Sequence, residues 1–135
     1  MWDISQLSVL HEFVERKAQT VSRGVIYLCG DVGVGKTALV QYWLHCAGVR
    51  EAVNSPSYQI VNCYQSAAQR FLHADLYRLA EAEELLYLDV REWRDMADVL
   101  FVEWPEKGDG YLPPADIICQ LSLSEGVRLL RWREL

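Results

Sequence analysis

A glycine-rich segment that ends in lysine and threonine carries the strongest chemical signal in the sequence. The pattern G-x-x-x-x-G-K-[ST] is matched in full by Gly30-Asp31-Val32-Gly33-Val34-Gly35-Lys36-Thr37. Glycines let the backbone fold tightly enough for successive N–H groups to point at phosphate oxygens, and the lysine adds a positive charge for the β- and γ-phosphates. The threonine hydroxyl is suited to Mg²⁺. The segment is therefore predicted to bind a nucleoside triphosphate.

The residues on either side of this segment argue against an ordinary glycine turn. Val25–Cys29 is a short, continuously apolar run, which is typical of a strand buried on both faces. From Thr37 to about Ala47 the residues favour a helix, and Gly48 follows as a stop signal. A helix that starts at the loop presents the positive end of its dipole to an anion. Strand, loop and helix in this order are the context that the motif requires.

Two acidic residues stand at the ends of strand-like runs, where they could serve phosphate chemistry. Glu103 follows the apolar run Val99–Val102, and a carboxylate at a strand tip beside the loop would hold Mg²⁺ or its waters. The alternative is an acid that simply ends a strand. Asp75 closes the run Phe71–Asp75 and could order the attacking water or, instead, cap a turn. His73 in the same run is interpreted as structural.

A third polar segment, Ser55-Pro56-Ser57, offers two hydroxyls around a conformationally locked proline. Its place after the helix of the loop is similar to that of a switch segment whose hydroxyl senses the γ-phosphate and Mg²⁺, and a simple turn is the alternative. No Asn-Lys-x-Asp sequence, a guanine-binding signature, occurs in the chain. Adenine is therefore favoured over guanine as the base.

The remaining pattern predicts the elements that must hold these residues in place. A first helix is indicated by Leu7, Leu10, Val14 and Ala18 at helical spacing, with Ser5 as its N-cap. Further elements are expected as strands over Tyr58–Tyr64 and Arg70–Asp75, a helix over Glu81–Leu88, a loop over Pro105–Pro114, and strands over Asp116–Leu123 and Val127–Arg133. The sum is an α/β domain of the P-loop NTPase type, with a mainly parallel central sheet flanked by helices and an antiparallel C-terminal hairpin.

Length and charge exclude several classes of protein. With 135 residues the chain is expected to form a single domain, residues 1–135. Its formal net charge of −6 excludes a domain-wide basic coat that binds nucleic acid directly. The four cysteines form no C-x-x-C pair, so buried free thiols are expected instead of a zinc site. No signal peptide is present and no apolar run approaches the ~20 residues of a membrane span, so a cytoplasmic protein without membrane contact is expected.

These residues, in this order, resemble the TsaE family, the small ATPases of bacterial tRNA threonylcarbamoyladenosine (t6A) biosynthesis. Besides the glycine-rich loop, the resemblance rests on Ser55-Pro56-Ser57-Tyr58, on His73 to Leu79 with Glu83-Glu84-Leu85, and on Glu103 to Gly108. It implies an ATPase that binds ATP and Mg²⁺ and associates with the transferase proteins TsaB and TsaD. Such a protein would meet tRNA only indirectly, and its ATP hydrolysis would regulate or reset the transferase complex.

The resemblance also implies roles for single residues. Lys36, Asp75 and Glu103 are the expected catalytic residues, and Thr37 and Glu103 are the expected metal ligands. Ser57 would be the switch hydroxyl. The expected nucleotide contacts are Gly30, Asp31, Val32, Gly33, Val34, Gly35, Lys36, Thr37, Ala38, Ser57 and Trp104, the last of which would lie beside the nucleotide.

Three positions depart from the residues that are usual in that family. Ala38 stands where a second threonine is usual, which removes one hydroxyl contact to phosphate. Ser57 replaces the usual threonine and keeps the hydroxyl, and Ala74 replaces a usual phenylalanine beside Asp75. Because no charged group of the site is lost, we expect these changes to affect nucleotide affinity and turnover rate.

Two other functions fit a phosphate-binding loop. A small-molecule kinase would need an acceptor pocket and a basic lid, and the chain shows no basic lid segment. A non-hydrolysing, nucleotide-dependent interaction module fits the aromatic content and the loop Tyr111-Leu112-Pro113-Pro114. For the ATPase, no arginine is clearly placed as a finger in the motifs, and Arg78 is the nearest candidate. We therefore expect slow hydrolysis in isolation that partners accelerate.

Overall fold

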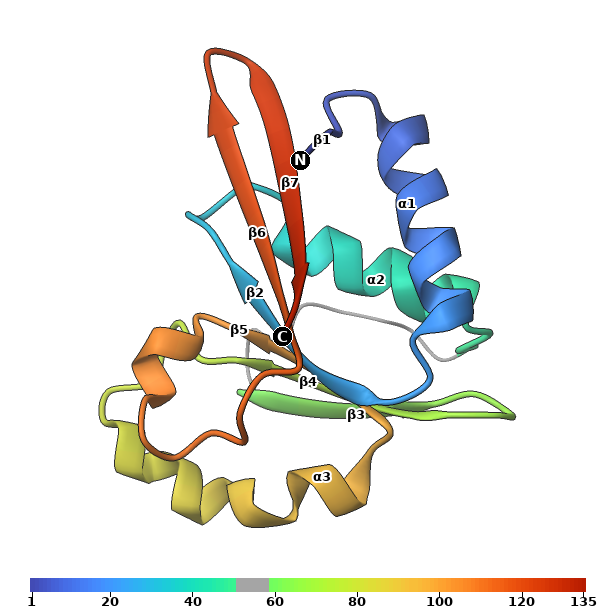
Figure 1. Ribbon diagram of the computed structural model, residues 1–135. Coiled ribbons are helices and arrows are strands. Elements are labelled where there is room, and N and C mark those ends of the chain that lie inside the picture. Colours follow the sequence, from blue (N-terminus) through green and yellow to red (C-terminus); the bar gives the residue numbers. More distant parts are fainter. Residues whose placement is uncertain (51–58) are drawn as a thin grey trace.

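The computed structural model describes residues 1–50 and 59–135, and within them seven strands form one twisted sheet (Figure 1). The strands are β1 (Trp2–Asp3), β2 (Gly24–Cys29), β3 (Val61–Gln65), β4 (Arg70–Asp75), β5 (Val99–Glu103), β6 (Ile117–Ser124) and β7 (Val127–Glu134). Their order across the sheet is β1-β7-β6-β2-β5-β4-β3. The central neighbours β6, β2, β5 and β4 are parallel. Antiparallel pairs join β1 to β7, β6 to β7 and β3 to β4.

This topology confirms the predicted α/β class and the antiparallel C-terminal hairpin, which β6 and β7 form. The parallel part is confined to the four central strands, because antiparallel strands extend the sheet at both edges. β3 begins at Val61, and its expected start, Tyr58, lies outside the described residues. Since parallel strands end on the same side, the carboxyl ends of β2, β5 and β4 meet at one edge, where open α/β sheets bind ligands.

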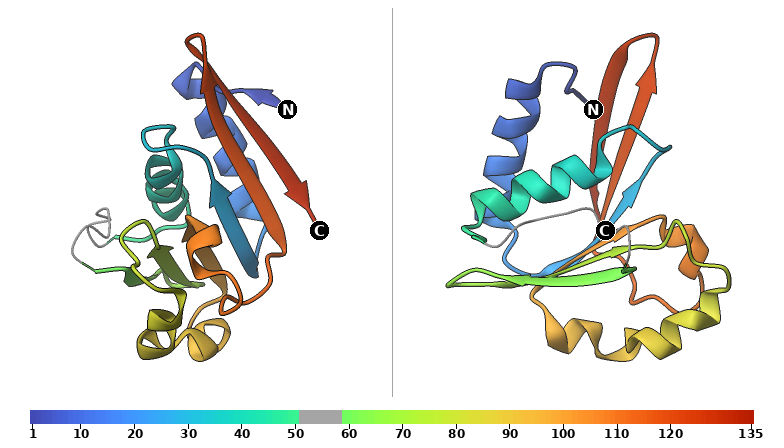
Figure 2. Two further views of the ribbon diagram at one scale, coloured as in Figure 1. Left: turned by 90° about the vertical axis from the view of Figure 1, so that its left-hand side faces the viewer. Right: turned by 180° about the vertical axis from the view of Figure 1, so that it is seen from behind.

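Helices cover both faces of the sheet (Figure 2). One face carries α1 (Leu7–Thr20) and α2 (Lys36–Cys46), the other carries the 3-10 helices η1 (Ala82–Leu88) and η2 (Val90–Glu92) with α3 (Trp93–Met96), and a third 3-10 helix, η3 (Pro105–Gly108), follows β5. Alternate residues of β5 serve the two layers: Phe101 packs with Trp43 of α2, and Leu100 packs in the cluster of Trp93. Every second residue of β5 therefore packs on the sheet face that α2 covers.

The expected Ser5 cap on the first helix is wrong. α1 begins at Leu7 after Gln6, which makes no side-chain cap hydrogen bond. The hydroxyl oxygen of Ser5 instead accepts the backbone N–H of Arg128 at 2.9 Å. Ser5 therefore joins the N-terminal segment to β7, and local helix signals do not reveal a partner so distant in the chain.

The segment expected as a helix over Glu81–Leu88 is the 3-10 helix η1. Glu81 is its N-cap and forms a capping box with Glu84, whose carboxylate accepts the Glu81 N–H at 2.7 Å. Asp89, at a φ of 57°, ends it. The loop expected over Pro105–Pro114 likewise begins with a helical turn, η3. Hydrophobic spacing alone does not separate such short 3-10 segments from α-helix or loop.

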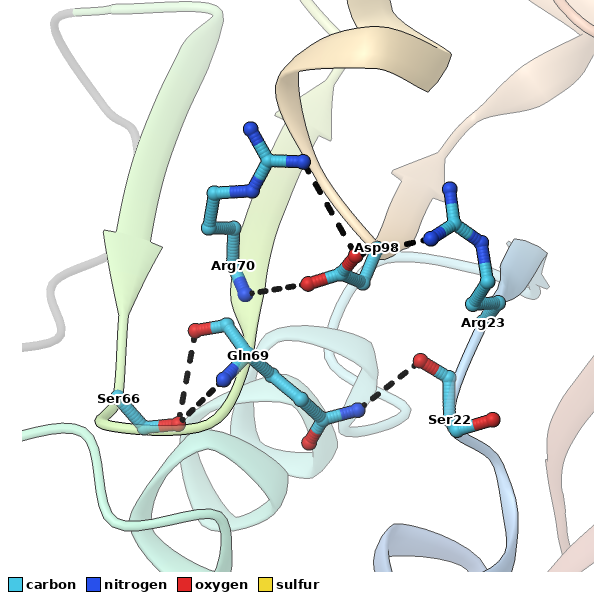
Figure 3. Close-up of polar contacts among 6 residues, drawn as sticks. All are labelled: Ser22, Arg23, Ser66, Gln69, Arg70 and Asp98. Carbon is cyan, nitrogen blue, oxygen red and sulfur yellow. Dashed lines mark hydrogen bonds and ion pairs between the residues drawn. The ribbon is translucent and has the colours of Figure 1, made fainter.

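A polar network at the amino ends of the central strands fixes how they start (Figure 3). The carboxylate of Asp98 accepts the backbone N–H of Arg70 at 2.9 Å and a guanidinium N–H of Arg23 at 3.2 Å. Beside it, the Gln69 side chain donates to the carbonyl oxygen of Ser22 at 3.1 Å. These contacts join the starts of β2, β4 and β5 and help to set the register that brings their opposite ends together.

Not all of the cysteine thiols are buried. All four cysteines are free. Of these, Cys119 is buried and Cys63 is exposed, so the expectation of buried thiols is wrong for Cys63.

Within residues 1–50 and 59–135, no helix has the length and apolar character needed to cross a membrane.

Candidate nucleotide-binding site

The loop between β2 and α2 adopts a conformation that depends on glycine. Gly30 has a φ of 141°, and a Cβ built on it would lie 2.4 Å from the carbonyl oxygen of Leu121 on β6. Gly35 has a φ of 104° and is the N-cap residue of α2. A side chain at Gly30 would push the loop away from the sheet, and one at Gly35 would strain the turn into the helix. The loop therefore opens directly onto the N-terminus of α2, where backbone N–H groups lack helical partners.

Lys36 is the first residue of α2 and is 5% exposed. Its Nζ donates a hydrogen bond to the carbonyl oxygen of Gly30 and lies 3.9 Å from the ring centroid of Trp104. Burial lowers the pKa of Lys36, and the carboxylates of Glu103 and Asp75 oppose this. The ammonium group is thus held inside the loop against an aromatic face, which leaves it near any phosphate bound there.

Glu103 and Asp75 end the neighbouring strands β5 and β4, where they form a register pair. Glu103 is 2% exposed. The hydroxyl of Thr37 donates to this carboxylate, with Oγ1 at 3.1 Å from Oε1 and 3.0 Å from Oε2. The predicted metal ligands, from α2 and β5, are therefore in direct contact.

Asp75 makes the turn contact that one of its two alternatives expected, and it also faces the cavity. One carboxylate oxygen accepts the backbone N–H of Tyr77 at 3.1 Å, which is a turn contact. The side chain also lines the cavity in front of the loop. Burial raises the pKa of Asp75, and the nearby Glu103 carboxylate adds to this. A carboxylate in this position can accept a hydrogen bond from a water molecule in the cavity.

One cavity of about 290 Å³ brings most of the predicted site residues together. It is lined by Val32, Gly33, Gly35, Lys36, Thr37, Ala38, Asp75, Tyr77, Glu103 and Trp104. Gly30, Asp31 and Val34 are not part of this lining, and Val34 is buried in the core. Ser57 lies outside the described residues. The volume is near the lower limit of small-molecule sites, so the cavity fits the phosphate end of a nucleotide better than a whole nucleotide.

Two residues of the site escaped the sequence analysis. Tyr77 lines the cavity, and its ring centroid lies 5.1 Å from that of Trp104. His73, interpreted as structural, lies with Nε2 2.5 Å from Glu103 Oε2. A signal for His73 was present: on a strand, residues two apart share a face, so a functional Asp75 places His73 on the same face.

The oxygen donors of the site fit Mg²⁺. Magnesium prefers hard oxygen ligands and usually takes only one or two from the protein, with water and phosphate supplying the rest. The contact between the Thr37 hydroxyl and the Glu103 carboxylate offers such a pair. Across the described residues, no group of three or more histidine, cysteine, aspartate or glutamate side chains could hold a metal ion by itself. A metal that needs a complete protein cage, such as structural zinc, is not suited to this donor set.

Fold and site together define an α/β protein with a glycine-rich loop at the carboxyl edge of a central parallel sheet. A crystal structure of Bacillus subtilis YdiB has the same fold, with a TM-score of 0.79 at 20% identity over 98% of this chain and 83% of that one. The chain belongs to the TsaE family, because the family model described as threonylcarbamoyl adenosine biosynthesis protein TsaE matches residues 4–130.

Relatives named tRNA threonylcarbamoyladenosine biosynthesis protein TsaE agree with this assignment. The protein from Haemophilus influenzae is 38% identical over 112 residues, which cover 83% of this chain and 71% of the relative. The protein from Synechocystis is 35% identical over 109 residues, which cover 77% of this chain and 69% of the relative. The resemblance that the sequence motifs indicated is therefore confirmed at the level of the family.

Proposed function

We propose that this protein is a Mg²⁺-dependent ATPase of tRNA t6A biosynthesis that acts with TsaB and TsaD and contacts tRNA only through them. One observation carries the biochemical part: Lys36, Thr37 and Glu103 converge on one cavity at the mouth of a phosphate-binding loop. Family membership supports the pathway, because the relatives are named for it. In this proposal, ATP hydrolysis regulates or resets the transferase complex.

The residues of the cavity divide the work between binding and chemistry. The loop amides and the Lys36 ammonium bind the β- and γ-phosphates and stabilise the charge that develops on them. Thr37 and Glu103 would hold Mg²⁺, which neutralises phosphate charge when bound. Asp75, across from the loop, orients water for attack on the γ-phosphate. Trp104 packs against Lys36 and closes one side of the cavity.

The lining of the cavity supports dependence on a partner. No arginine is among its described lining residues, and Arg78 in particular is absent from them. Arg128 approaches Gly35 from β7, with Nη1 3.5 Å from the position of an added Cβ, but does not line the cavity either. Since an arginine that reaches the γ-phosphate is a large part of the rate in related chemistry, the isolated chain should hydrolyse ATP slowly.

A binding experiment with the partner proteins tests the pathway assignment. The tagged protein is incubated with purified TsaB and TsaD of the same organism, with and without ATP and Mg²⁺, and retained proteins are identified by mass spectrometry. Retention that depends on nucleotide is the expected result. Absence of both partners in every condition would contradict the proposed association.

Product analysis separates the ATPase from its alternatives. Release of inorganic phosphate from ATP is expected in the reconstituted mixture. Binding without hydrolysis, even with both partners present, would indicate a nucleotide-dependent interaction module instead. A phosphorylated small molecule formed from a metabolite pool would indicate a kinase.

A further inference from the structure

His73 makes a buried contact with Glu103, the magnesium ligand of the proposed function. It is 0% exposed on β4, and its Nε2 lies 2.5 Å from Oε2 of Glu103 at the end of β5. Register pairs place His73 opposite Phe101, one same-face step before the pair of Asp75 and Glu103. Glu103 lines the cavity and His73 does not, so the imidazole contacts the carboxylate from outside the cavity lining.

The surroundings of His73 are not those of a histidine that merely fills space. Its Nδ1 is buried and has no hydrogen-bond partner in the described part of the chain, so Glu103 supplies the hydrogen bond of the ring there. A leucine or methionine at this position would pack without leaving a buried nitrogen unpartnered. With a carboxylate in front of Nε2, the proton of the neutral ring belongs on Nε2 and the lone pair on Nδ1. The ring is thus set up to donate to Glu103.

This donation divides the two oxygens of Glu103 between different tasks. Oε2 accepts from His73 and also lies 3.0 Å from the Thr37 hydroxyl, whereas Oε1 lies 3.1 Å from that hydroxyl and makes no hydrogen bond with His73. A carboxylate held at one oxygen cannot rotate freely. Its other oxygen is then presented in a fixed direction, and fixed ligands bind metal more tightly than mobile ones.

We propose that His73 is a positioning residue that holds the Glu103 carboxylate in the orientation that binds Mg²⁺. The proposal rests on the proposed function, because it requires Glu103 to be a magnesium ligand. It concerns the hydrogen bond from Nε2 and assigns His73 no contact with nucleotide. Loss of the imidazole should therefore weaken the use of Mg²⁺ and leave metal-free nucleotide binding intact.

The test compares three variants by calorimetric titration of ADP over a series of MgCl₂ concentrations, with EDTA as the metal-free point. His73→Leu removes the donor and should raise the Mg²⁺ concentration at half effect by about 10- to 100-fold. His73→Gln keeps an N–H near the position of Nε2 and should stay within about threefold of the wild type. His45→Leu makes the same change at a histidine that does not line the cavity and should match the wild type. ADP affinity in EDTA should be unchanged in all of them.

Two possible results distinguish failure of the proposed magnesium site from failure of the role of His73. A wild-type protein whose ADP binding ignores Mg²⁺ would contradict the magnesium part of the proposed function, and the positioning role of His73 with it. A magnesium-dependent wild type whose folded His73→Leu variant has the same Mg²⁺ midpoint would overturn the positioning role alone. If His73→Leu does not fold, His73→Met provides a second apolar replacement.

A spectroscopic measurement reads the hydrogen bond on the unaltered His73 side chain of the wild type. The chain has three histidines, so the ring nitrogens of His73 can be assigned in long-range ¹H–¹⁵N spectra as those missing from His73→Gln. We expect a protonated Nε2 that donates to Glu103. A neutral ring protonated on Nδ1 could not donate to Glu103 and would overturn the proposal.

Discussion

At the scale of single residues, the proposed phosphate binding should depend most on the cation of Lys36. It lines the cavity from the first turn of α2, and no arginine lines the cavity among the described residues. We expect Lys36→Ala to reduce ATP hydrolysis by about 100-fold or more, as loss of a charge-stabilising donor does elsewhere. Lys17→Ala removes a lysine that packs on Phe13 and Trp132 instead and is the matched control. A phosphate-release assay with equal turnover in both variants would contradict the site.

Replacing Asp75 by asparagine should raise stability and lower activity. Its pKa in the folded protein is raised above 3.8, mainly by burial, so folding favours the protonated form and ionisation costs stability as pH rises through the raised pKa. Asp75→Asn keeps an acceptor for the Tyr77 N–H and should unfold at a higher temperature than the wild type at pH 7. This advantage should shrink as the pH falls toward 3.8, the ordinary value.

Turnover by Asp75→Asn should nevertheless fall by about 100-fold, the typical contribution of a positioned base. Thermal unfolding at pH 7 and pH 4, together with phosphate release at pH 7, checks both halves. A variant less stable than the wild type at pH 7 would contradict the burial argument, and a variant with full turnover would contradict the catalytic role.

Most cavity residues could be predicted from the sequence because each belongs to a recognisable pattern of adjacent residues. Lys36 and Thr37 belong to one contiguous motif, and Glu103 directly follows an apolar run. Tyr77 was missed because its neighbour in the site is Trp104, which follows the adjacent strand. The two-residue spacing from Asp75 indicated the face of His73 but not its contact with Glu103 on β5. Contacts between strands depend on register, and no local pattern in this sequence states which residue of β4 faces which residue of β5.

At the scale of elements, Asp98 should stabilise the junction where β2, β4 and β5 begin (Figure 3). Asp98→Ala would remove the acceptor of the exposed Arg70 N–H and should lower the free energy of unfolding by about 0.5–1.5 kcal/mol. The ion pair with Arg23, whose side chain is 70% exposed, should add little to this. Asp98→Asn keeps an oxygen acceptor and should cost less. Urea unfolding of the two variants measures the difference, and equal losses would show that the backbone contact is not the main one.

The elements themselves were predictable to different degrees. The buried strands β2 and β5 and the helix α2 follow from apolar runs and glycine signals within a few residues. The cap of α1 did not follow, because Ser5 is taken by Arg128 of β7. The 3-10 form of η1 did not follow either, because hydrophobic spacing does not separate a short 3-10 segment from an α-helix. The antiparallel strand β1 at the sheet edge was also missed, since two residues are too few to show a period.

At the scale of the whole molecule, the net charge of −6 bears on how the protein could meet tRNA. Binding to nucleic acid through phosphates requires clustered cations and weakens steeply with salt. We expect the isolated protein to retain no tRNA in a filter-binding assay at physiological salt, and tRNA to be retained when TsaB and TsaD are added. Retention of tRNA by the isolated chain would contradict the proposed indirect contact.

The lining of the cavity also bears on how fast the isolated protein should hydrolyse ATP. The cavity holds a lysine, two carboxylates and a hydroxyl but no lining arginine among the described residues, so part of the charge stabilisation for γ-phosphate transfer must come from elsewhere. An arginine supplied by a partner contributes about 10³–10⁵-fold in related enzymes. We therefore expect TsaB and TsaD together to accelerate phosphate release by at least about tenfold, and Lys36→Ala to remove that acceleration. An isolated chain as fast as the mixture would show instead that the site is complete without its partners.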